Sequence, residues 1–346
     1  SATEADQCLG CHTHFVPAER RGKRYRLEDG VSCEACHGGA QNWLGIHISG
    51  ARHAENLAAG LFPTEDPAQR ARLCLACHHG SAARPIDHQL MAAGHPPLVF
   101  ELDTYTAIQP PHYQLDADYR ARKTPASGLQ TWFVGQLRAA QAQLEFLSGE
   151  RWRMQGVQPE LIAFDCHACH HSLDKPRWEA GVGGPLPPGR LRLHDAHLVM
   201  VSLGLAVLVP ERAAAWDKAV ADLQRATLSS AAAVRMQAET MQRPLIEVLA
   251  SAASLDYSKA ALWRLAQQLA DRAQSGDGAD FSAAEQMALA LGALSADLRL
   301  RGESLPPEVD PALDALLDAV GNRIAFEAAG FRQAVARLTQ LLRAGE

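Results

Sequence analysis

Residues 33–37 read Cys33-Glu-Ala-Cys36-His37, a pair of cysteines separated by two residues and followed directly by histidine. The same pattern occurs at Cys8-Leu-Gly-Cys11-His12, Cys74-Leu-Ala-Cys77-His78 and Cys166-His-Ala-Cys169-His170. These four motifs contain all 8 cysteines of the chain. Because 15 of the 346 residues are histidine, four such coincidences have chance odds of about one in a few hundred thousand. The pattern therefore reflects a chemical requirement.

The Cys-x-x-Cys-His pattern is the attachment site of c-type haem. The two thiols form thioethers with the vinyl groups of the porphyrin, and the histidine is the proximal ligand of the iron. We therefore expect four covalently attached haem c groups. The expected attachment residues are Cys8, Cys11, Cys33, Cys36, Cys74, Cys77, Cys166 and Cys169, and the expected proximal ligands are His12, His37, His78 and His170.

Three other uses of paired cysteines fit the sequence less well. Zinc ribbons combine two pairs, or one pair with spaced histidines, and give no reason for a histidine after every pair. A secreted disulfide framework does not resemble closely spaced pairs in a long, Ala-rich chain. A thioredoxin-type redox motif requires a βαβ context, and a fourfold repeat is unexpected there.

The composition excludes two classes of partner. With 47% hydrophobic and 21% charged residues, the 346-residue chain is typical of a globular protein of two or three domains. A net charge of −6 gives no broad basic face for nucleic acid. The longest apolar run, residues 196–209, is too short for a membrane span and contains His197. We expect neither a nucleic-acid partner nor a membrane-spanning helix.

The predicted cofactor also indicates a compartment. Haem c is attached after export, so we expect the protein to function in the periplasm. Residues 1–7 are polar and lack the apolar stretch of a signal peptide. We therefore expect this sequence to be the processed form of an exported precursor.

The chain divides by composition into two parts. Every Cys and His lies between Cys8 and His197, and residues 198–346 contain neither. A Gly- and Pro-rich stretch at 181–189 is typical of a linker. The sequence predicts a mainly α fold, with a loop-rich tetrahaem cytochrome domain at 1–189 and an antiparallel α-helical bundle at 190–346. For the bundle we consider oligomerisation into a homo-oligomer, docking of a partner, or structural support.

Periodic apolar residues predict the individual helices. The expected ranges are 129–147 in the first part, and 195–209, 211–242, 244–253, 258–274, 282–301 and 311–342 in the second. Breaks are expected at Pro210, Pro244, 275–278 and 306–307. Ser282 and Glu285 have the spacing of a capping box.

Eleven further histidines remain as candidates for the second axial position of the irons. The best are His47, ten residues after the second motif, His88 and His95, seven residues apart, and His112, fixed by two prolines. Weaker candidates are His194, His197 and His53. We expect His14, His79, His167 and His171, which lie beside proximal ligands, to contact propionates or solvent, and Met91 to pack in a helix.

The second motif also resembles a known family. Residues 30–38, Gly-Val-Ser-Cys-Glu-Ala-Cys-His-Gly, followed by 42–47, Asn-Trp-Leu-Gly-Ile-His, resemble the cytochrome c-554 family of tetrahaem proteins. Residues 87–102 and 165–178 look like segments of larger bacterial relatives with a helical C-terminal extension. The family's first haem has no counterpart before Cys8, and a fourth motif appears instead at Cys166. The resemblance implies that the haem of His12 is five-coordinate.

These observations predict a periplasmic tetrahaem cytochrome that transfers electrons between a protein donor and a protein acceptor. An alternative is an oxidoreductase with one open haem that acts on a small nitrogen or sulfur compound, with residues 112–123 near the open iron. A third is a subunit whose bundle presents the haems to a larger oxidoreductase.

Overall fold

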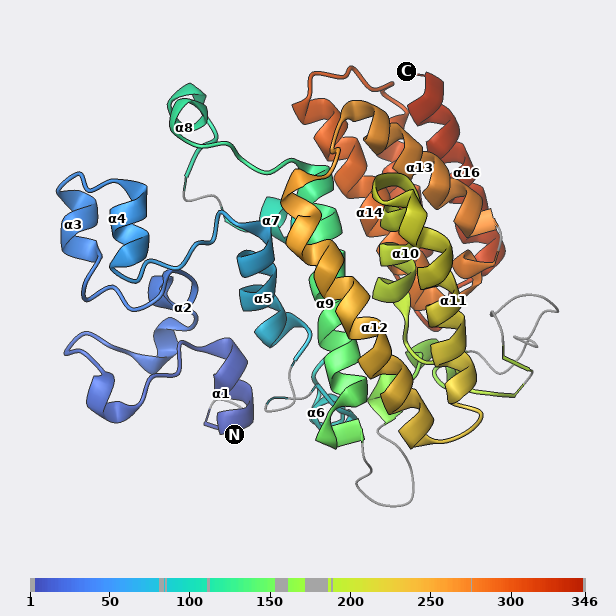
Figure 1. The fold of residues 1–346 in the computed structure, drawn as a ribbon, viewed down its shortest axis with the longest axis horizontal. Helices are drawn as coiled ribbons and strands as arrows, with labels where there is room; N and C mark the ends of the chain where they lie inside the picture. Colours follow the sequence, from blue (N-terminus) through green and yellow to red (C-terminus); the bar gives the residue numbers. More distant parts are fainter. Residues whose placement is uncertain are drawn as a thin grey trace.

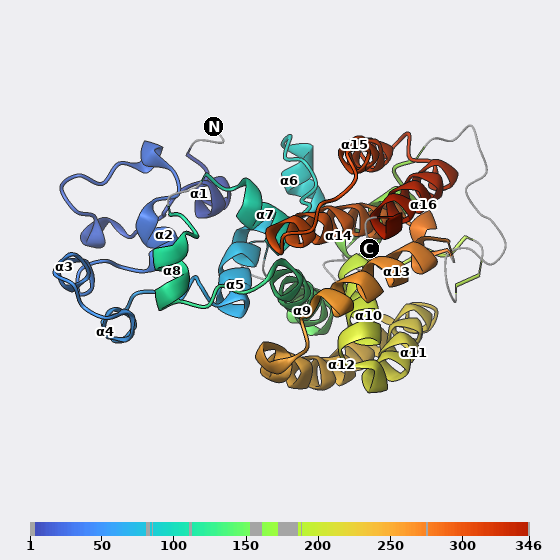
Figure 2. The ribbon, with the colours of Figure 1, turned by 90° about the horizontal axis from the view of Figure 1, so that it is seen from above.

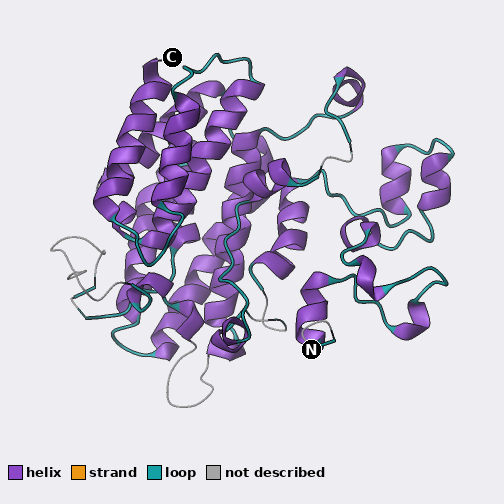
Figure 3. Ribbon diagram, turned by 180° about the vertical axis from the view of Figure 1, so that it is seen from behind, coloured by secondary structure: helices purple, strands orange, loops and turns teal. Residues whose placement is uncertain are grey.

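The structure is a computed structural model that describes residues 4–80, 84, 86–110, 113–152, 161–171, 186–187, 189–274 and 276–344. Within these residues the chain is helical, and its β pairing is an isolated bridge between Phe164 and Leu193 (Figure 3). The prediction of a mainly α fold is confirmed. None of the helices in these ranges has the apolar length needed to cross a membrane.

The first part of the chain consists of short helices joined by loops. They are α1 (Asp6–His12), α2 (Cys33–His37), α3 (Leu44–Ile48), α4 (His53–Ala58), α5 (Pro67–His78), α6 (His88–Ala92), α7 (Leu102–Ile108) and α8 (Ala117–Arg122). In Figures 1 and 2, α1–α4 lie at one end of the molecule, and α5 and α7 lie between them and the long helices. Of the described residues before α5, just Leu9 and Trp43 are buried hydrophobic side chains. This end of the protein therefore has almost no core made of side chains.

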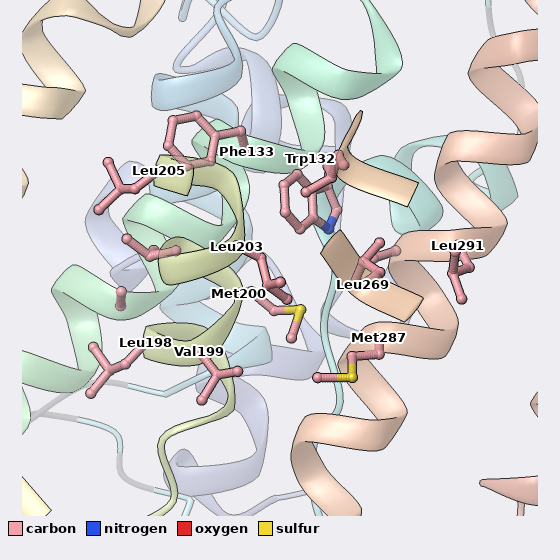
Figure 4. Packing of buried hydrophobic residues seen from close by; sticks show 14 of the residues in the cluster. Trp132, Phe133, Leu198, Val199, Met200, Leu203, Leu205, Leu269, Met287 and Leu291 are labelled. Atoms are coloured by element: carbon pink, nitrogen blue, oxygen red, sulfur yellow. The ribbon is translucent and has the colours of Figure 1, made fainter. Parts of the chain in front are cut away.

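The long helices form a bundle around one continuous core. They are α9 (Gly128–Ser148), α10 (Ala196–Leu208), α11 (Pro210–Ala226), α12 (Ala231–Ser251), α13 (Lys259–Gln274), α14 (Phe281–Leu300), α15 (Val309–Ala319) and α16 (Ala328–Ala344). The core runs from Leu129 to Leu342. Figure 4 shows Trp132 and Phe133 of α9 gathered with Met200 and Leu203 of α10.

Helix α9 precedes the expected linker, yet it packs against α10, α12 and α14. The same helix contacts α5 and α7. The core thus crosses residue 189, and a division into domains at 1–189 and 190–346 stays a prediction. Most of the expected linker, 181–185 and 188, lies outside the described residues.

Helices α10, α13 and α14 lie within two residues of their expected ranges, but the range 211–242 is wrong. The helix ends at Ala226, and a new helix begins after Ser230, whose hydroxyl accepts a hydrogen bond from the backbone N–H of Ala233 at 3.1 Å. A serine is a good N-cap because it satisfies one of the unpaired N–H groups of the first turn. The local capping signal thus divides an apolar pattern that looked continuous.

The expected break at Pro244 is also wrong, because Pro244 lies inside α12. A proline within a helix removes one backbone hydrogen bond and disfavours the helix. Here the buried face continues on both sides of it, with Met241 before and Leu245 after, and α12 packs along α9. Burial of that face outweighs the local cost of the proline.

Two further boundaries differ from expectation. The range 311–342 is divided into α15 and α16, and in the connection Asn322 Oδ1 accepts hydrogen bonds from the N–H groups of Ile324 and Ala325. Helix α14 has Asp280 as its N-cap, with the carboxylate accepting from the N–H of Ala283 at 2.9 Å. The expected capping box of Ser282 and Glu285 is therefore incorrect, since both residues lie inside the helix.

A carboxylate from α14 fixes the start of α9. Asp297, 3% exposed, accepts a hydrogen bond from the backbone N–H of Leu129 at 2.8 Å and binds Arg301 with both oxygens at 2.9 Å. The negative charge lies where the helix dipole favours it. Asp103 of α7 lies close by, and burial, followed by Glu101 and Asp297, raises the pKa of its carboxyl from 3.8 to about 8.

We expect Gly204→Ala to destabilise the protein, since a Cβ on this residue of α10 would fall on the ring carbons Cδ2 and Cε2 of Phe133. Overpacking of this kind costs about 1–3 kcal/mol. Gly292→Ala in α14 is the matched control, because its Cβ would meet no atom within 4 Å, and loss of a helical glycine favours the folded state by about 0.5–1 kcal/mol. Urea unfolding should separate the two variants in opposite directions. Equal midpoints would show that α9 and α10 are not in close contact.

We expect Asp103→Asn to flatten the pH dependence of stability. Between pH 3.8 and about 8, the unfolded chain releases the Asp103 proton while the folded chain retains it. The free energy of unfolding therefore falls as pH rises, by up to about 1.4 kcal/mol per pH unit for one proton. Urea unfolding across this range should show a smaller slope for Asp103→Asn than for Asp314→Asn, a control on the exposed side of α15. Identical slopes would contradict the raised pKa.

Candidate functional site

Each cysteine–histidine motif is built on a turn of helix. Helix α1 carries the first motif, α2 the second and the end of α5 the third, and each of these helices ends on the motif histidine. The fourth motif begins in a 3-10 turn at Cys166–Ala168, and the N–H of His170 donates to the carbonyl of Cys166 at 2.8 Å. Residues at i, i+3 and i+4 share one helix face. The geometry therefore presents two thiols and an imidazole together, as attachment of a haem requires.

The eight thiols are not used in disulfides. Burial raises the pKa of Cys36, Cys74 and Cys166, so these groups are neutral thiols rather than reactive thiolates. Among the described residues, no three His, Cys, Asp or Glu side chains converge on a point that suits a metal ion. A zinc ribbon needs such a cluster, whereas a porphyrin supplies four of the iron ligands itself. The two thiols and one imidazole of each motif are the donor set that haem c attachment requires.

Three of the motifs meet at α5. The Cys77 thiol forms a hydrogen bond with Cys11 of the first motif, and burial followed by Cys11 raises the pKa of Cys77 to about 11. The Cys74 thiol lies near enough to Cys36 of the second motif for ionisation of Cys36 to raise the pKa of Cys74. The attachment points of the first three motifs are thus neighbours in space, although 25 and 41 residues separate successive motifs in the sequence.

The third motif has an aromatic support. The His78 ring stacks on Phe100 at 5.3 Å between centroids and meets the edge of Tyr105 at 5.1 Å. The Tyr105 hydroxyl donates to the carbonyl of Val99 at 2.6 Å, which fixes that ring. Burial lowers the pKa of His78, so its imidazole is neutral, as a metal ligand must be. Sequence reasoning missed Phe100 and Tyr105, which lie more than 20 residues after the motif.

The predicted distal histidines lie in different surroundings. His95 lies beside His12 of the first motif, with 6.2 Å between ring centroids. His47, at the end of α3, meets Trp43 at 6.2 Å, and His88 is exposed at the start of α6. His112 lies outside the described residues. The structure thus brings one of the four next to a motif histidine, and the roles of the others stay predictions.

Three other histidines gather behind α5. His79 and His194 line a cavity of about 400 Å³ between α5, α9 and the 3-10 turn Leu161–Ala163. The ring of His197 lies 5.9 Å from His79 and 6.3 Å from His194. Burial lowers the pKa of all three, that of His79 to about 4, so they are neutral imidazoles.

A chain of hydrogen bonds orients His197. Its Nδ1 donates to Oε1 of Gln136 at 2.8 Å, Gln136 donates to Gln286 at 3.0 Å, and Gln286 donates to the carbonyl of Phe100 at 3.2 Å. Because the chain ends on a carbonyl, which can only accept, each amide orientation and the imidazole tautomer are fixed. The sequence offered no signal for this arrangement, since Gln136 and Gln286 are 150 residues apart.

The segment considered for an enzyme pocket has a different character. Its described residues, 113–123, include the exposed helix α8, on which Tyr113 stacks with Tyr119 at 5.7 Å. The Lys123 ammonium lies 5.3 Å from the Tyr119 ring, and Arg122 pairs with Asp118. In Figure 1, α8 projects from the body of the protein. Its aromatic and basic groups contact one another on the surface.

Comparison with known proteins gives one family similarity. A family model described as cytochrome c554 and c-prime matches residues 1–38, which contain the first two motifs. No curated protein and no solved structure matches the chain. The match agrees with the resemblance seen at the second motif, and the number of haems and a relationship of the helical bundle to this family stay predictions. The similarity of this chain to the family thus extends over Cys8–His12 and Cys33–His37.

Proposed function

We propose that this chain is a c-type cytochrome that transfers electrons between two redox proteins, with a haem c at each of its four motifs. The observation that carries this proposal is the shared geometry of the motifs, each of which presents two thiols and an imidazole on one turn. The family similarity of residues 1–38 supports the same cofactor at the first two motifs. Export to the periplasm follows from the chemistry of haem c attachment.

The residues of this chain bind the cofactor and set its surroundings. Haem c, when bound, supplies an iron that accepts and releases one electron. The cysteines fix the position of each porphyrin, and the motif histidines bind from one side. Phe100 and Tyr105 hold the His78 ring in place. Cys11 lies beside Cys77, and Cys36 lies near Cys74. The first three attachment points would therefore be close together, which favours electron transfer from haem to haem.

The poor packing of the first part of the chain also supports bound haem. The described residues before α5 bury just two hydrophobic side chains, and helices of five to seven residues are unstable alone in water. Porphyrins would supply the missing apolar surface. The bundle needs no such help, because its core is continuous. We propose that the bundle serves as the surface for a redox partner or for a second copy of the chain.

The alternative of an oxidoreductase requires an open iron next to acid, base or cationic groups. The described groups considered for that role lie on the exposed helix α8 and directly beside it, and Tyr113 and Lys123 contact Tyr119. We therefore favour electron transfer over catalysis.

We expect the double variant Cys166→Ala/Cys169→Ala to lose the mass of one haem while the other three stay attached. Intact-mass spectrometry of the denatured protein measures this directly, because thioethers survive denaturation. The double variant Cys33→Ala/Cys36→Ala is the matched comparison and should also lose one. If the purified wild-type protein has the mass of the bare polypeptide, or holds zinc, the proposal is wrong.

We expect the two parts of the chain to respond differently to the absence of haem. When the protein is produced without haem attachment, limited proteolysis should cleave residues 4–60 readily, since side chains alone give them almost no core. The bundle helices, whose core runs from Leu129 to Leu342, should resist. Attachment of haem should protect residues 4–60. Equal protection of these residues with and without haem would show that porphyrin does not form their core.

A further inference from the structure

The first motif is fastened to the segment that carries His95. The Arg84 guanidinium donates to the carbonyl of Gly10 at 2.5 Å. At the same junction, the ring centroids of His12 and His95 lie 6.2 Å apart, with an angle of 65° between their planes. Two separate contacts thus place the His12 side of α1 against Arg84 and the loop that follows α6.

The backbone around His95 is well defined. Helix α6 ends in a turn at Gly94, whose φ of 101° favours glycine, and the N–H of His95 donates to the carbonyl of Leu90 at 3.3 Å. Pro96 follows directly and restricts the chain on the other side. This geometry fixes the direction in which the His95 side chain leaves the turn.

The hydrogen bond of His95 also fixes its tautomer. Nδ1 of His95 lies 2.7 Å from the carbonyl oxygen of Pro96. A carbonyl can only accept, so Nδ1 carries the proton and Nε2 has a lone pair. Histidines that bind metals commonly donate their other ring N–H to a carbonyl in this way. His95 is therefore prepared as a ligand through Nε2.

We propose that His95 is the second axial ligand of the iron attached at Cys8 and Cys11, opposite His12, so that this iron is six-coordinate. The proposal rests on the proposed function. Two imidazoles on opposite sides of one iron, each bound at about 2 Å, have ring centres roughly 6 Å apart, and the observed separation is 6.2 Å. The angle between the ring planes is free, because rotation about the metal–nitrogen bonds leaves this distance unchanged.

The inference departs from what the family resemblance implies for this haem, a five-coordinate iron. His14 is closer to His12 in the sequence, but it is not the second ligand of this iron. The Nδ1 of His14 lies 2.7 Å from the Ser32 hydroxyl, and the extended backbone of Thr13 carries His14 away from the turn that ends at His12. With His95 bound, the first iron has no vacant position for a substrate.

The test uses the holoprotein and its electron paramagnetic resonance spectrum. We expect the oxidised His95→Ala protein to show one high-spin ferric haem that the wild type lacks, with the haem mass per chain unchanged. Added imidazole should restore the low-spin state, and cyanide should bind the variant. His14→Ala is the matched control, since it removes the neighbouring histidine, and its spectrum should equal that of the wild type.

Three outcomes would overturn the assignment. They are a His95→Ala protein without a new high-spin haem, a high-spin signal produced by His14→Ala instead, and a wild-type high-spin haem that disappears in Cys8→Ala/Cys11→Ala. If His95→Ala fails to fold, the haem reduction potentials of His95→Met test the proposal. An iron with His and Met ligands stays low-spin at a raised potential. Potentials equal to those of the wild type would refute the proposal. A chain without attached haem would refute the proposed function instead, which mass spectrometry detects separately.

Discussion

The chemistry of the motifs depends on one turn of helix. Two thiols and an imidazole must face the same side, and positions i, i+3 and i+4 do so only when the backbone between them is coiled. The structure provides that turn at all four motifs, with five residues in α2 and seven in α1. Helices this short do not stand alone in water. Their stability therefore depends on what packs against them, and on the proposed function porphyrins attached at the motifs would supply that apolar surface.

Helix α9 connects these short helices to a bundle that is stable by ordinary packing. Helix α9 contacts α5 and α7 as well as α10, α12 and α14. The hydrogen bonds from His197 through Gln136 and Gln286 to Phe100 run across the same junction. Since Phe100 stacks on His78, the bundle helps to determine the position of the histidine of the third motif. Packing and hydrogen bonds thus connect the two parts of the chain, wherever the boundary between them lies.

The motifs are visible in the sequence itself, and apolar periodicity predicted much of the helical bundle. These predictions failed where tertiary packing determines the structure. Helices α10, α13 and α14 follow from their apolar periodicity. The break expected at Pro244 was wrong, because the buried face of α12 continues through it. His95 was a predicted ligand, but its neighbour His12 lies 83 residues away in the sequence, and spacing cannot reveal such a pair. His79, His194 and His197 gather because α5 and α10 both pack against α9, so the sequence did not predict that they lie together.

The four motifs differ in their surroundings, and this bears on the direction of electron transfer. Burial and nearby charge are among the factors that set the potential of a haem. His78 lies against two aromatic rings, and the neutral imidazoles of His79, His194 and His197 lie behind its helix, whereas the ring neighbour of His12 is His95. Near the fourth motif, Cys166 is surrounded by Arg323, Asp165 and Asp280. On the proposed function, unequal surroundings would give the attached haems unequal potentials. Such differences would favour one direction of electron transfer through the chain.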